Sequence, residues 1–308
     1  MEFGFLTIAI GAKKYIRQAE FLCRSLKKNM PGIPIAVVTD CESFVGNVDF
    51  IVPPNSDYSI GAIQKILIDT YSPFERTLFI DSDCIVTKPF NDQLLALRGF
   101  EFTPAMEHFV ASTGSDFYIV DLEKALSLVG GSRFPKFNGG IYYFERGDFA
   151  RKIFEMAREY AKSPEKLGIK RFDAAGVGDE TVIALALAHY HVDNLYFDSG
   201  ELMRTPTGLE GKITIEPLGG GCSFTGSEGW MAPAICHFAG KYINRSEYYL
   251  AKQSLMRNVS VQSLGSYQYF LAFWISGWRS FMMVLKYKLS GLRRRYKSIS
   301  ARLVRLAG

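Results

Sequence analysis

A short apolar strand that ends in two carboxylates constrains this chain more than any other stretch. Residues 77–80 are β-branched, aromatic and aliphatic, which is typical of a strand buried on both faces of a sheet. Asp81 and Asp83 follow directly. Side chains alternate along an extended backbone, so these two point the same way and Ser82 points opposite. Because open α/β sheets bind ligands at this end of their strands, the stretch predicts a polar site there.

The spacing of Asp81 and Asp83 favours a divalent metal ion. Two neighbouring carboxylates repel each other unless a cation lies between them. Their hard oxygen atoms suit Mg²⁺ or Mn²⁺, whose remaining positions would be shared with a diphosphate. The alternative is an ordinary acidic strand end, since Asp-x-Asp also occurs in solvated turns. The buried strand before Asp81 favours the metal site.

Strand and helix patterns alternate along the chain, which predicts an α/β fold with a mostly parallel, Rossmann-like sheet flanked by helices. We expect early strands at residues 5–10, 35–38, 50–52 and 77–80, and helices at 13–29 and 60–71. Further on we expect a strand at 118–120, helices at 122–129, 148–162 and 179–189, and a last strand at 234–238. Residues 134–144 are predicted to be a loop that leads into a strand, with glycines where the backbone approaches another group closely. Residues 219–230 are predicted to be a mobile glycine-rich loop.

Composition places the chain among globular proteins of a reducing compartment. It has 308 residues, of which 48% are hydrophobic and 22% charged, so it is able to bury a core. The five cysteines form no C-x-x-C pair, which argues against a zinc site and a disulfide framework. The N-terminus shows no basic region or cleavage site typical of export. We therefore expect a cytoplasmic protein.

Charge divides the chain into a mildly acidic body at residues 1–258 and a basic tail at 259–308. All 31 Asp and Glu precede residue 259, whereas the tail holds nine of the 36 Lys and Arg. One helical face of the tail is apolar, and the opposite face is polar and basic. The apolar face consists of Phe270, Leu271, Trp274, Ile275, Trp278, Phe281, Met282, Leu285, Leu289 and Leu292.

This pattern predicts that residues 264–305 bind an anionic membrane surface, with the protein peripheral on the inner face of the membrane. Spanning is disfavoured because Arg279 near the middle of a span costs roughly 2.5–3.5 kcal/mol. The alternative is a pair of helices that pack on the body or on a partner protein. A basic run with aromatics also binds RNA in some proteins, but the continuous apolar face makes a nucleic-acid partner unexpected.

Several motifs together resemble the GT-A glycosyltransferases, in particular family 8, which includes glycogenin and bacterial lipopolysaccharide galactosyl- and glucosyltransferases. The resemblance covers roughly the first 245 residues. Its motifs are Val38-Thr-Asp40, Ile63-Gln-Lys65, Phe79-Ile-Asp-Ser-Asp83, Phe137-Asn-Gly-Gly140, Gly178-Asp-Glu180 and His237-Phe-Ala-Gly240.

The resemblance implies a transfer of hexose from a nucleotide sugar, UDP-hexose, to a glycan or lipid-linked acceptor in cell-surface polysaccharide synthesis. It implies Mn²⁺ or Mg²⁺ held by Asp81, Asp83 and His237. The residues implied at the sugar are Asn138, Gly139, Asp179 and Glu180, and those at the nucleotide and diphosphate are Ala9, Ile10, Gly11, Tyr15, Asp40, Lys65, Ser82, Gly240 and Lys241.

The chain departs from the family pattern at three positions. One is Lys65, which sits one residue off the family spacing, so an insertion or a different role is open there. Glu180 stands where the family has Gln, so it could act as a general base in an inverting reaction, whereas the family expectation is retention. Ile243 replaces the lysine that follows the family's His and Gly, and Lys241 or Arg245 could take its place at the diphosphate. Two other functions stay open at this stage: a phosphohydrolase of the haloacid dehalogenase type and a non-catalytic sugar-nucleotide binder on a membrane.

Overall fold

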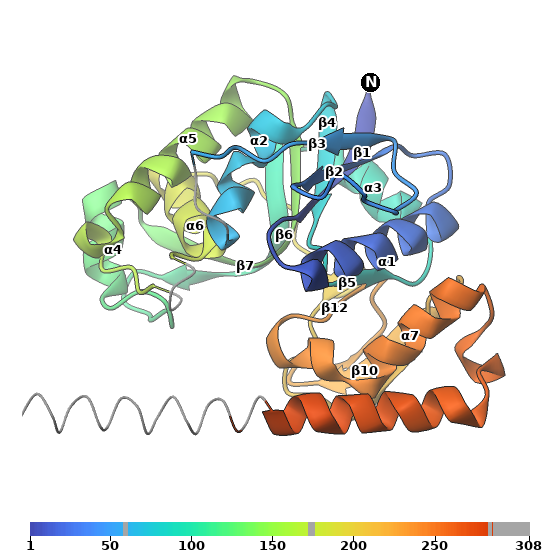
Figure 1. The fold of residues 1–308 in the computed structure, drawn as a ribbon. Helices are drawn as coiled ribbons and strands as arrows, with labels where there is room; N and C mark the ends of the chain where they lie inside the picture. The colour runs from blue at the N-terminus through green and yellow to red at the C-terminus, as the bar shows by residue number, and fades with distance from the viewer. Residues whose placement is uncertain (58–60, 172–175, 283–284, 286–308) are drawn as a thin grey trace, which may run out of the picture.

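The structure, a computed structural model, describes residues 1–57, 61–171, 176–282 and 285 of the chain. It confirms an α/β fold built on a six-stranded sheet of order β3-β2-β1-β4-β7-β6 (Figure 1). These strands are β1 Phe3–Ala9, β2 Ile35–Thr39, β3 Phe50–Val52, β4 Arg76–Ile80, β6 Phe102–Ala111 and β7 Arg133–Glu145. Neighbours from β3 to β4 pair in parallel, and β7 pairs antiparallel with both β4 and β6. Only β7 therefore runs against the common direction within this sheet.

Helices cover both faces of the sheet, because successive strand residues point to opposite sides. Leu6, Val38 and Phe79 lie in one core, and their sequence neighbours Phe5 and Val37 lie in the other. The first core is covered by α4 Leu122–Val129, α5 Asp148–Lys162 and α6 Asp179–His189, with η1 Ala62–Leu67, α2 Ile68–Tyr71 and η2 Pro164–Leu167 beside them. The second is covered by α1 Lys13–Asn29 and α3 Asn91–Leu97.

Two small sheets lie below the main one in Figure 1. One joins β5 Cys84–Val86, β12 Ile235–His237 and β8 Met203–Arg204, and the other joins β9 Glu210–Glu216, β10 Gly221–Gly226 and β11 Gly229–Met231. They pack with η4 Gly240–Asn244, α7 Ser246–Arg257 and η5 Val261–Ser263. Since β5 begins where β4 ends, this layer brings β12 to the carboxyl end of β4.

Two sequence predictions for glycine-containing stretches are wrong. The expected mobile loop at 219–230 is instead largely the β10–β11 hairpin, in which buried Cys222 and Phe224 alternate with half-buried residues. The expected loop at 134–144 lies within β7, where β6 pairs with it through two register shifts. In both cases cross-strand pairing outweighs the low strand propensity of glycine.

The expected strand at 118–120 is also wrong, because only an isolated bridge joins Ile119 to Ile169. The expected helix at 60–71 is a 3₁₀ turn followed by a single α-helical turn, with residues 58–60 outside the described part. By contrast, the expected helix at 122–129 is confirmed, and the Asp121 side chain caps it by accepting a hydrogen bond from the Lys124 amide.

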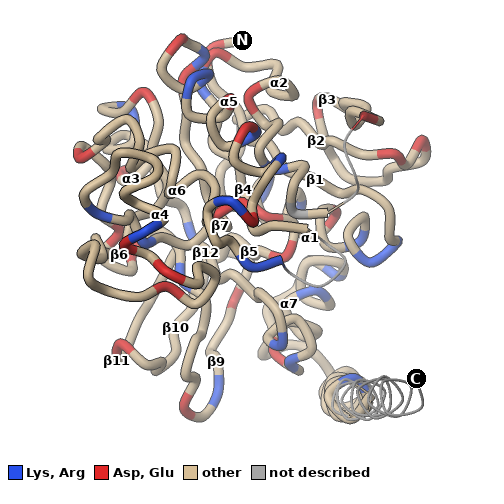
Figure 2. Tube along the Cα trace, turned by 90° about the vertical axis from the view of Figure 1, so that its left-hand side faces the viewer, with Lys and Arg blue, Asp and Glu red and all other residues tan. Residues whose placement is uncertain are grey.

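After η5 the chain forms a helix over residues 266–282. Its buried Ala272 packs with Leu250 of α7 and with Leu264. Leu289 and Leu292 of the predicted apolar face, and every basic residue of the tail except Arg279, lie outside the described residues. From β1 to α7 acidic and basic residues are mixed along the chain (Figure 2). No helix within the described ranges is long and apolar enough to cross a membrane.

Candidate active site

A cavity of about 540 Å³ opens at the carboxyl ends of β1 and β4. The predicted site residues that line it are Ile10, Tyr15, Lys65, Asp81, Ser82, Asp83, Asp179, Glu180 and Gly240. They come from strand ends, α1, η1, the start of α6 and the segment after β12. The chain direction of the sheet therefore gathers in one place residues that are far apart in the sequence.

One side of the cavity holds a carboxylate and histidine cluster. Nε2 of His237 lies 3.1 Å from Oδ1 of Asp83 and 3.7 Å from Oδ2 of Asp81. The register of β12 against β5, in which His237 faces Cys84, sets this approach. Burial by itself lowers the pKa of His237, but the two carboxylates outweigh it and raise that pKa. Positive charge, from a proton or a metal ion, is therefore favoured between these groups.

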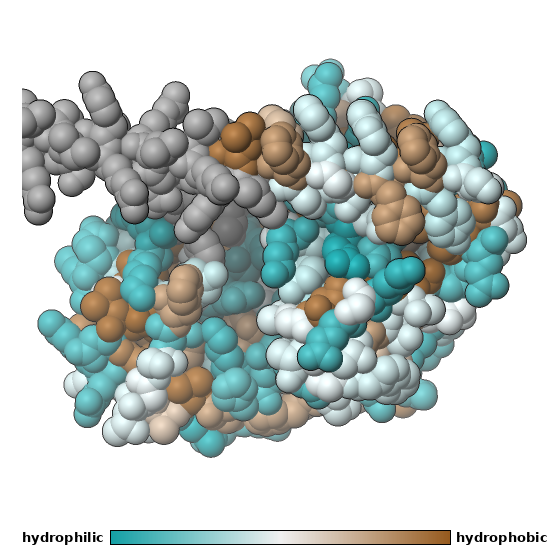
Figure 3. Space-filling view, turned by 90° about the horizontal axis from the view of Figure 1, so that it is seen from below, coloured by the Kyte–Doolittle hydropathy of each residue, from teal (hydrophilic) through white to brown (hydrophobic). Residues whose placement is uncertain are grey.

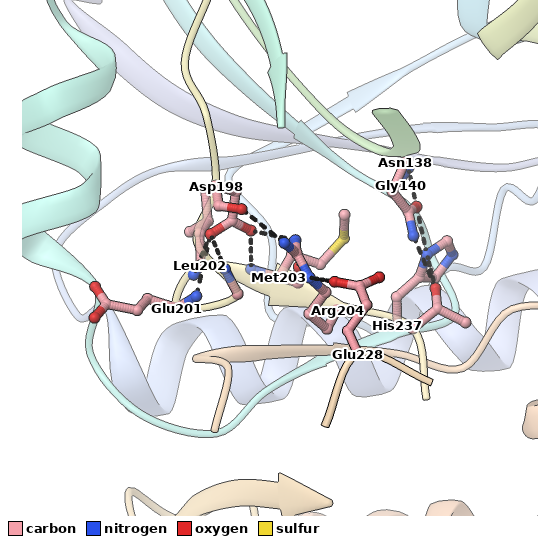
Figure 4. Close-up of polar contacts among 11 residues, drawn as sticks. Asn138, Gly140, Asp198, Glu201, Leu202, Met203, Arg204, Glu228 and His237 are labelled. Carbon is pink, nitrogen blue, oxygen red and sulfur yellow. Dashed lines mark hydrogen bonds and ion pairs between the residues drawn. The ribbon is translucent and has the colours of Figure 1, made fainter. Parts of the chain in front are cut away.

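The contacts of Nδ1, the other ring nitrogen of His237, show that Nε2 is the atom left to face the carboxylates. The backbone N–H of Gly140 donates to Oδ1 of Asn138 at 3.0 Å, so this amide atom must be the oxygen (Figure 4). The same oxygen lies 2.9 Å from Nδ1 of His237, so Nδ1 carries a proton and donates it. Nε2 then faces the carboxylates, where a proton or a metal ion is required.

The donor set fits a divalent metal. Within the described ranges, ligand atoms of Asp83, Cys84 and His237 lie within 4.8 Å of one another. Burial and the nearby carboxylates raise the pKa of the Cys84 thiol well above its usual value, so its sulfur is protonated and a poor ligand. Asp81 is the carboxylate that faces the same nitrogen. Asp83 and His237 with Asp81 would hold Mn²⁺ or Mg²⁺ through two hard oxygens and one imidazole.

The opposite side of the cavity is an acidic cluster bridged by Lys65. Its Nζ donates to Asp81 at 2.7 Å and to the Gly139 carbonyl at 3.1 Å, and lies 3.3 Å from Asp179. Asp179 also accepts from the hydroxyl of Tyr142 at 2.7 Å. Burial alone would lower the pKa of Lys65, but Asp179 and Asp81 raise it, so the ammonium is charged. Lys65 thus joins the carboxylates on the two sides of the cavity.

Glu180 begins α6 beside Asp179 and binds the backbone of β7. Its Oε1 accepts the N–H of Gly139 at 2.7 Å. Burial and then the charge of Asp179 raise the pKa of Glu180, so it is a weaker acid than a free glutamate. A side chain of this kind is suited to holding or accepting a proton inside the cavity.

The two glycines of β7 permit these contacts. A Cβ on Gly139 would lie 2.6 Å from the Glu180 side chain, and one on Gly140 would lie 2.8 Å from Nδ1 of His237. The sequence prediction that the backbone approaches something closely here is confirmed. The neighbours are α6 on one side and β12 on the other.

Several of the predicted site residues lie outside the cavity lining. Ala9 is fully buried in β1, and Gly139 donates its N–H to Glu180. Asn138 and His237 are not among the lining residues, although His237 contacts Asp83, which is. Asp40 is exposed and accepts the Gly11 backbone N–H with both carboxylate oxygens, so it holds the turn after β1. Lys241 is exposed, with its Nζ 5.3 Å from the centre of the Tyr242 ring.

Sequence reasoning missed other polar residues at the site. Gln18, Gln64, Tyr118 and Thr181 line the cavity, and Thr205 contacts both Asn138 and His237. The signal available for Gln18 was its position one helical turn after Tyr15 on α1. No local pattern singles out Thr205, because a separate strand brings it to the site.

Comparison with solved structures shows a GT-A-like glycosyltransferase fold. The bifunctional glycosyltransferase WbbM matches at 13% identity and a TM-score of 0.52, covering 84% of this chain and 50% of that one. This chain thus spans about half the length of WbbM. A galactosyltransferase, LgtC, in complex with donor and acceptor sugar analogues matches at 15% identity and a TM-score of 0.43, covering 67% and 76% of the two chains. The glycosyltransferase GlyE of Streptococcus pneumoniae TIGR4 matches at 14% identity and a TM-score of 0.41, covering 65% and 46%. No protein-family model and no curated protein sequence matches the chain.

Proposed function

We propose that this protein is a metal-dependent glycosyltransferase that moves a hexose from UDP-hexose to a glycan or lipid-linked acceptor. The observation that carries the proposal is the direction of Nε2 of His237, which points at Asp83 and Asp81 on the wall of a cavity of about 540 Å³. The GT-A-like fold supports it, because such folds present donors at this end of the sheet.

The residues divide into a donor side and a reaction side. Asp81, Asp83 and His237 would hold Mn²⁺, which would neutralise charge on the diphosphate as it leaves. Lys65 supplies a further positive charge between the two sides. Asp179 and Glu180 face the cavity at the start of α6, where they would bind the sugar hydroxyls and the acceptor proton.

The reaction breaks the bond between the sugar C1 and a diphosphate oxygen, and UDP leaves with the bonding electrons. An acceptor hydroxyl bonds to C1 and gives up its proton to a carboxylate at the start of α6. We expect retention of configuration at C1, and the anomeric proton of the product in an NMR spectrum tests this. An inverted product would instead assign Glu180 as a general base in direct displacement.

We infer in addition that the helix over 266–282 attaches the enzyme to an anionic membrane surface on the cytoplasmic side. Tyr267, Phe270, Trp274, Trp278 and Phe281 are between 56% and 67% exposed and recur at helical spacing. Seen from below, hydrophobic side chains of this helix lie on the outer surface (Figure 3). Such an aromatic stripe suits the interface of a bilayer, which is also where a lipid-linked acceptor would be located.

Thermal unfolding of the full chain with nucleotides and Mn²⁺ tests the catalytic proposal. A ligand at a hundred times its dissociation constant adds about 2.7 kcal/mol of stability. UDP should raise the unfolding temperature in the presence of Mn²⁺, and Asp83→Ala should abolish this gain. Asp92→Ala, at an exposed position in the first turn of α3, serves as the matched control. If no nucleoside diphosphate stabilises the unaltered chain with Mn²⁺ or Mg²⁺, the proposal fails.

A further inference from the structure

The segment between α6 and β8 contains a buried turn organised by one carboxylate. Asp198 is 4% exposed, and its side chain accepts the backbone N–H groups of Gly200, Glu201, Leu202 and Met203 at 2.9–3.1 Å (Figure 4). A carboxylate that receives this many backbone donors is held in one orientation. The turn therefore leads into β8 in one conformation.

Arg204 completes this turn from within β8. Its Nη1 lies 3.1 Å from Oδ2 of Asp198, and its Nη2 donates to the Asp198 carbonyl at 2.6 Å. Its Nε lies 3.7 Å from a carboxylate oxygen of Glu228, on the turn between β10 and β11. Arg204 is only 7% exposed, so its charge is compensated by Asp198 inside the protein.

The strand that follows the turn brings Thr205 into contact with Asn138 and His237. β8 pairs in parallel with β12, with Met203 opposite Ile235 and Arg204 opposite Cys236. Continued by one residue, this register places Thr205 beside His237. Its hydroxyl oxygen accepts from Nδ2 of Asn138 at 2.8 Å and lies 3.1 Å from Nδ1 of His237.

We propose that Thr205 is a positioning residue, which orients Asn138 and His237 for metal binding. The Asp198–Arg204 turn fixes the place of Thr205. The inference rests on the proposed function, because it concerns the metal site of the proposed transferase. The Thr205 hydroxyl fixes the amide of Asn138 so that its oxygen faces Nδ1 of His237. With Nδ1 occupied in this way, Nε2 points at Asp83. Partners of this kind, behind a metal-ligating histidine, set the ring orientation.

Removing the hydroxyl should loosen this arrangement without removing a ligand. Thr205→Val keeps the shape of the side chain but leaves Nδ2 of Asn138 without its acceptor, so the amide and the His237 ring lose a fixed orientation. Loss of such a partner typically weakens metal binding about 10- to 100-fold. Thr205→Ser retains the hydroxyl and should restore affinity.

Calorimetric titration of the full chain with Mn²⁺ in the presence of UDP measures this effect. Binding of UDP without metal and the unfolding temperature without ligand are measured beside it. Thr205→Val should weaken Mn²⁺ binding by about 10- to 100-fold and leave metal-free UDP binding within about twofold. If Thr205→Val fails to fold, Thr205→Ala makes the same test, because alanine also lacks the hydroxyl. Thr207→Val is the matched control, since this exposed threonine lies two residues further on.

The outcomes separate this inference from the proposed function. If Thr205→Val and Thr205→Ala bind Mn²⁺ with the same affinity as the unaltered chain, the proposed role of Thr205 is wrong. The proposed function is then unaffected. Equal losses in the Thr205 and Thr207 variants, or no recovery with Thr205→Ser, would also overturn it. If the unaltered chain binds no Mn²⁺ with UDP, both the proposed function and this inference fail.

Discussion

His237 lies with its Nε2 atom 3.1 Å from Oδ1 of Asp83, and a chain of hydrogen bonds behind it occupies the other ring nitrogen. The two residues belong to segments that the small β5-β12-β8 sheet brings together. In the proposed transferase, a cation held at this point would contact the donor side of the cavity, and Lys65 would supply positive charge between the donor side and the reaction side. The following predictions test these relationships.

Gly140→Ala should destabilise the protein and impair metal binding. Its Cβ would lie 2.8 Å from Nδ1 of His237 and 2.9 Å from Sδ of Met203, so the ring would have to move. Overpacking of this kind costs about 1–3 kcal/mol. Denaturant unfolding and a Mn²⁺ titration measure the two effects.

Gly147→Ala is the control for that variant. Gly147 precedes α5 with extended backbone, and no atom lies within 4 Å of its added Cβ. Its unfolding free energy should change by less than about 1 kcal/mol. A Gly140→Ala protein with unaltered stability and metal affinity would contradict the close approach of β7 to β12.

Lys65→Met should destabilise the protein far more than Lys27→Met. Lys65 is 16% exposed and bridges two carboxylates of the cavity, whose charges would be left buried without a partner. Removing one partner of a buried pair costs about 3–5 kcal/mol. Lys27 forms a single bridge to Asp49, whose side chain is 41% exposed, so its loss should cost no more than about 1 kcal/mol. Equal losses in chemical denaturation would refute a structural role for the buried ammonium.

Lys252 should make the stability rise with pH in the alkaline range. Burial, with Arg279 and Arg17 nearby, lowers the pKa of Lys252 to about 8. In the unfolded chain the usual value of 10.5 applies, so between about pH 8 and 10.5 the unfolded state binds more protons. The charged ammonium therefore destabilises the folded state below pH 8, and this penalty disappears as the pH rises.

Lys252→Met should remove that part of the pH dependence. The difference in unfolding free energy between the variant and the unaltered chain should shrink from pH 8 to pH 10.5. Comparing the two proteins cancels the titration of tyrosines shared by both. A difference that stays constant over this range would show that Lys252 does not titrate below its usual pKa.

Trp274→Ser combined with Trp278→Ser should weaken membrane binding. The two rings are stacked 6.4 Å apart and are 61% and 56% exposed, so they contribute little to the packed core. Sedimentation with phosphatidylglycerol vesicles should show at least about tenfold weaker binding, because apolar surface no longer enters the interface. Leu128→Ser, at a 57% exposed leucine on α4, should bind as before. Unchanged binding of the tryptophan variant would contradict the membrane proposal.

Local patterns were sufficient to predict much of the main sheet and its helices. The apolar run before Asp81 is β4, and the stripe at 13–29 is α1 with the expected bounds. Both predictions depend on residue periodicity, which a segment keeps whatever packs against it. Glycine content was misleading at residues 219–230, where the predicted loop is largely a hairpin.

The sequence by itself determined the strand that presents Asp81 and Asp83, the acidic start of α6 and the basic composition of the tail. Only the tertiary structure decided that Lys65 joins Asp81 to Asp179 and that Thr205 lies beside His237. The physical reason is that side-chain direction along one strand follows from its own geometry. Contacts between strands depend instead on register and on packing of distant segments, which no local pattern contains.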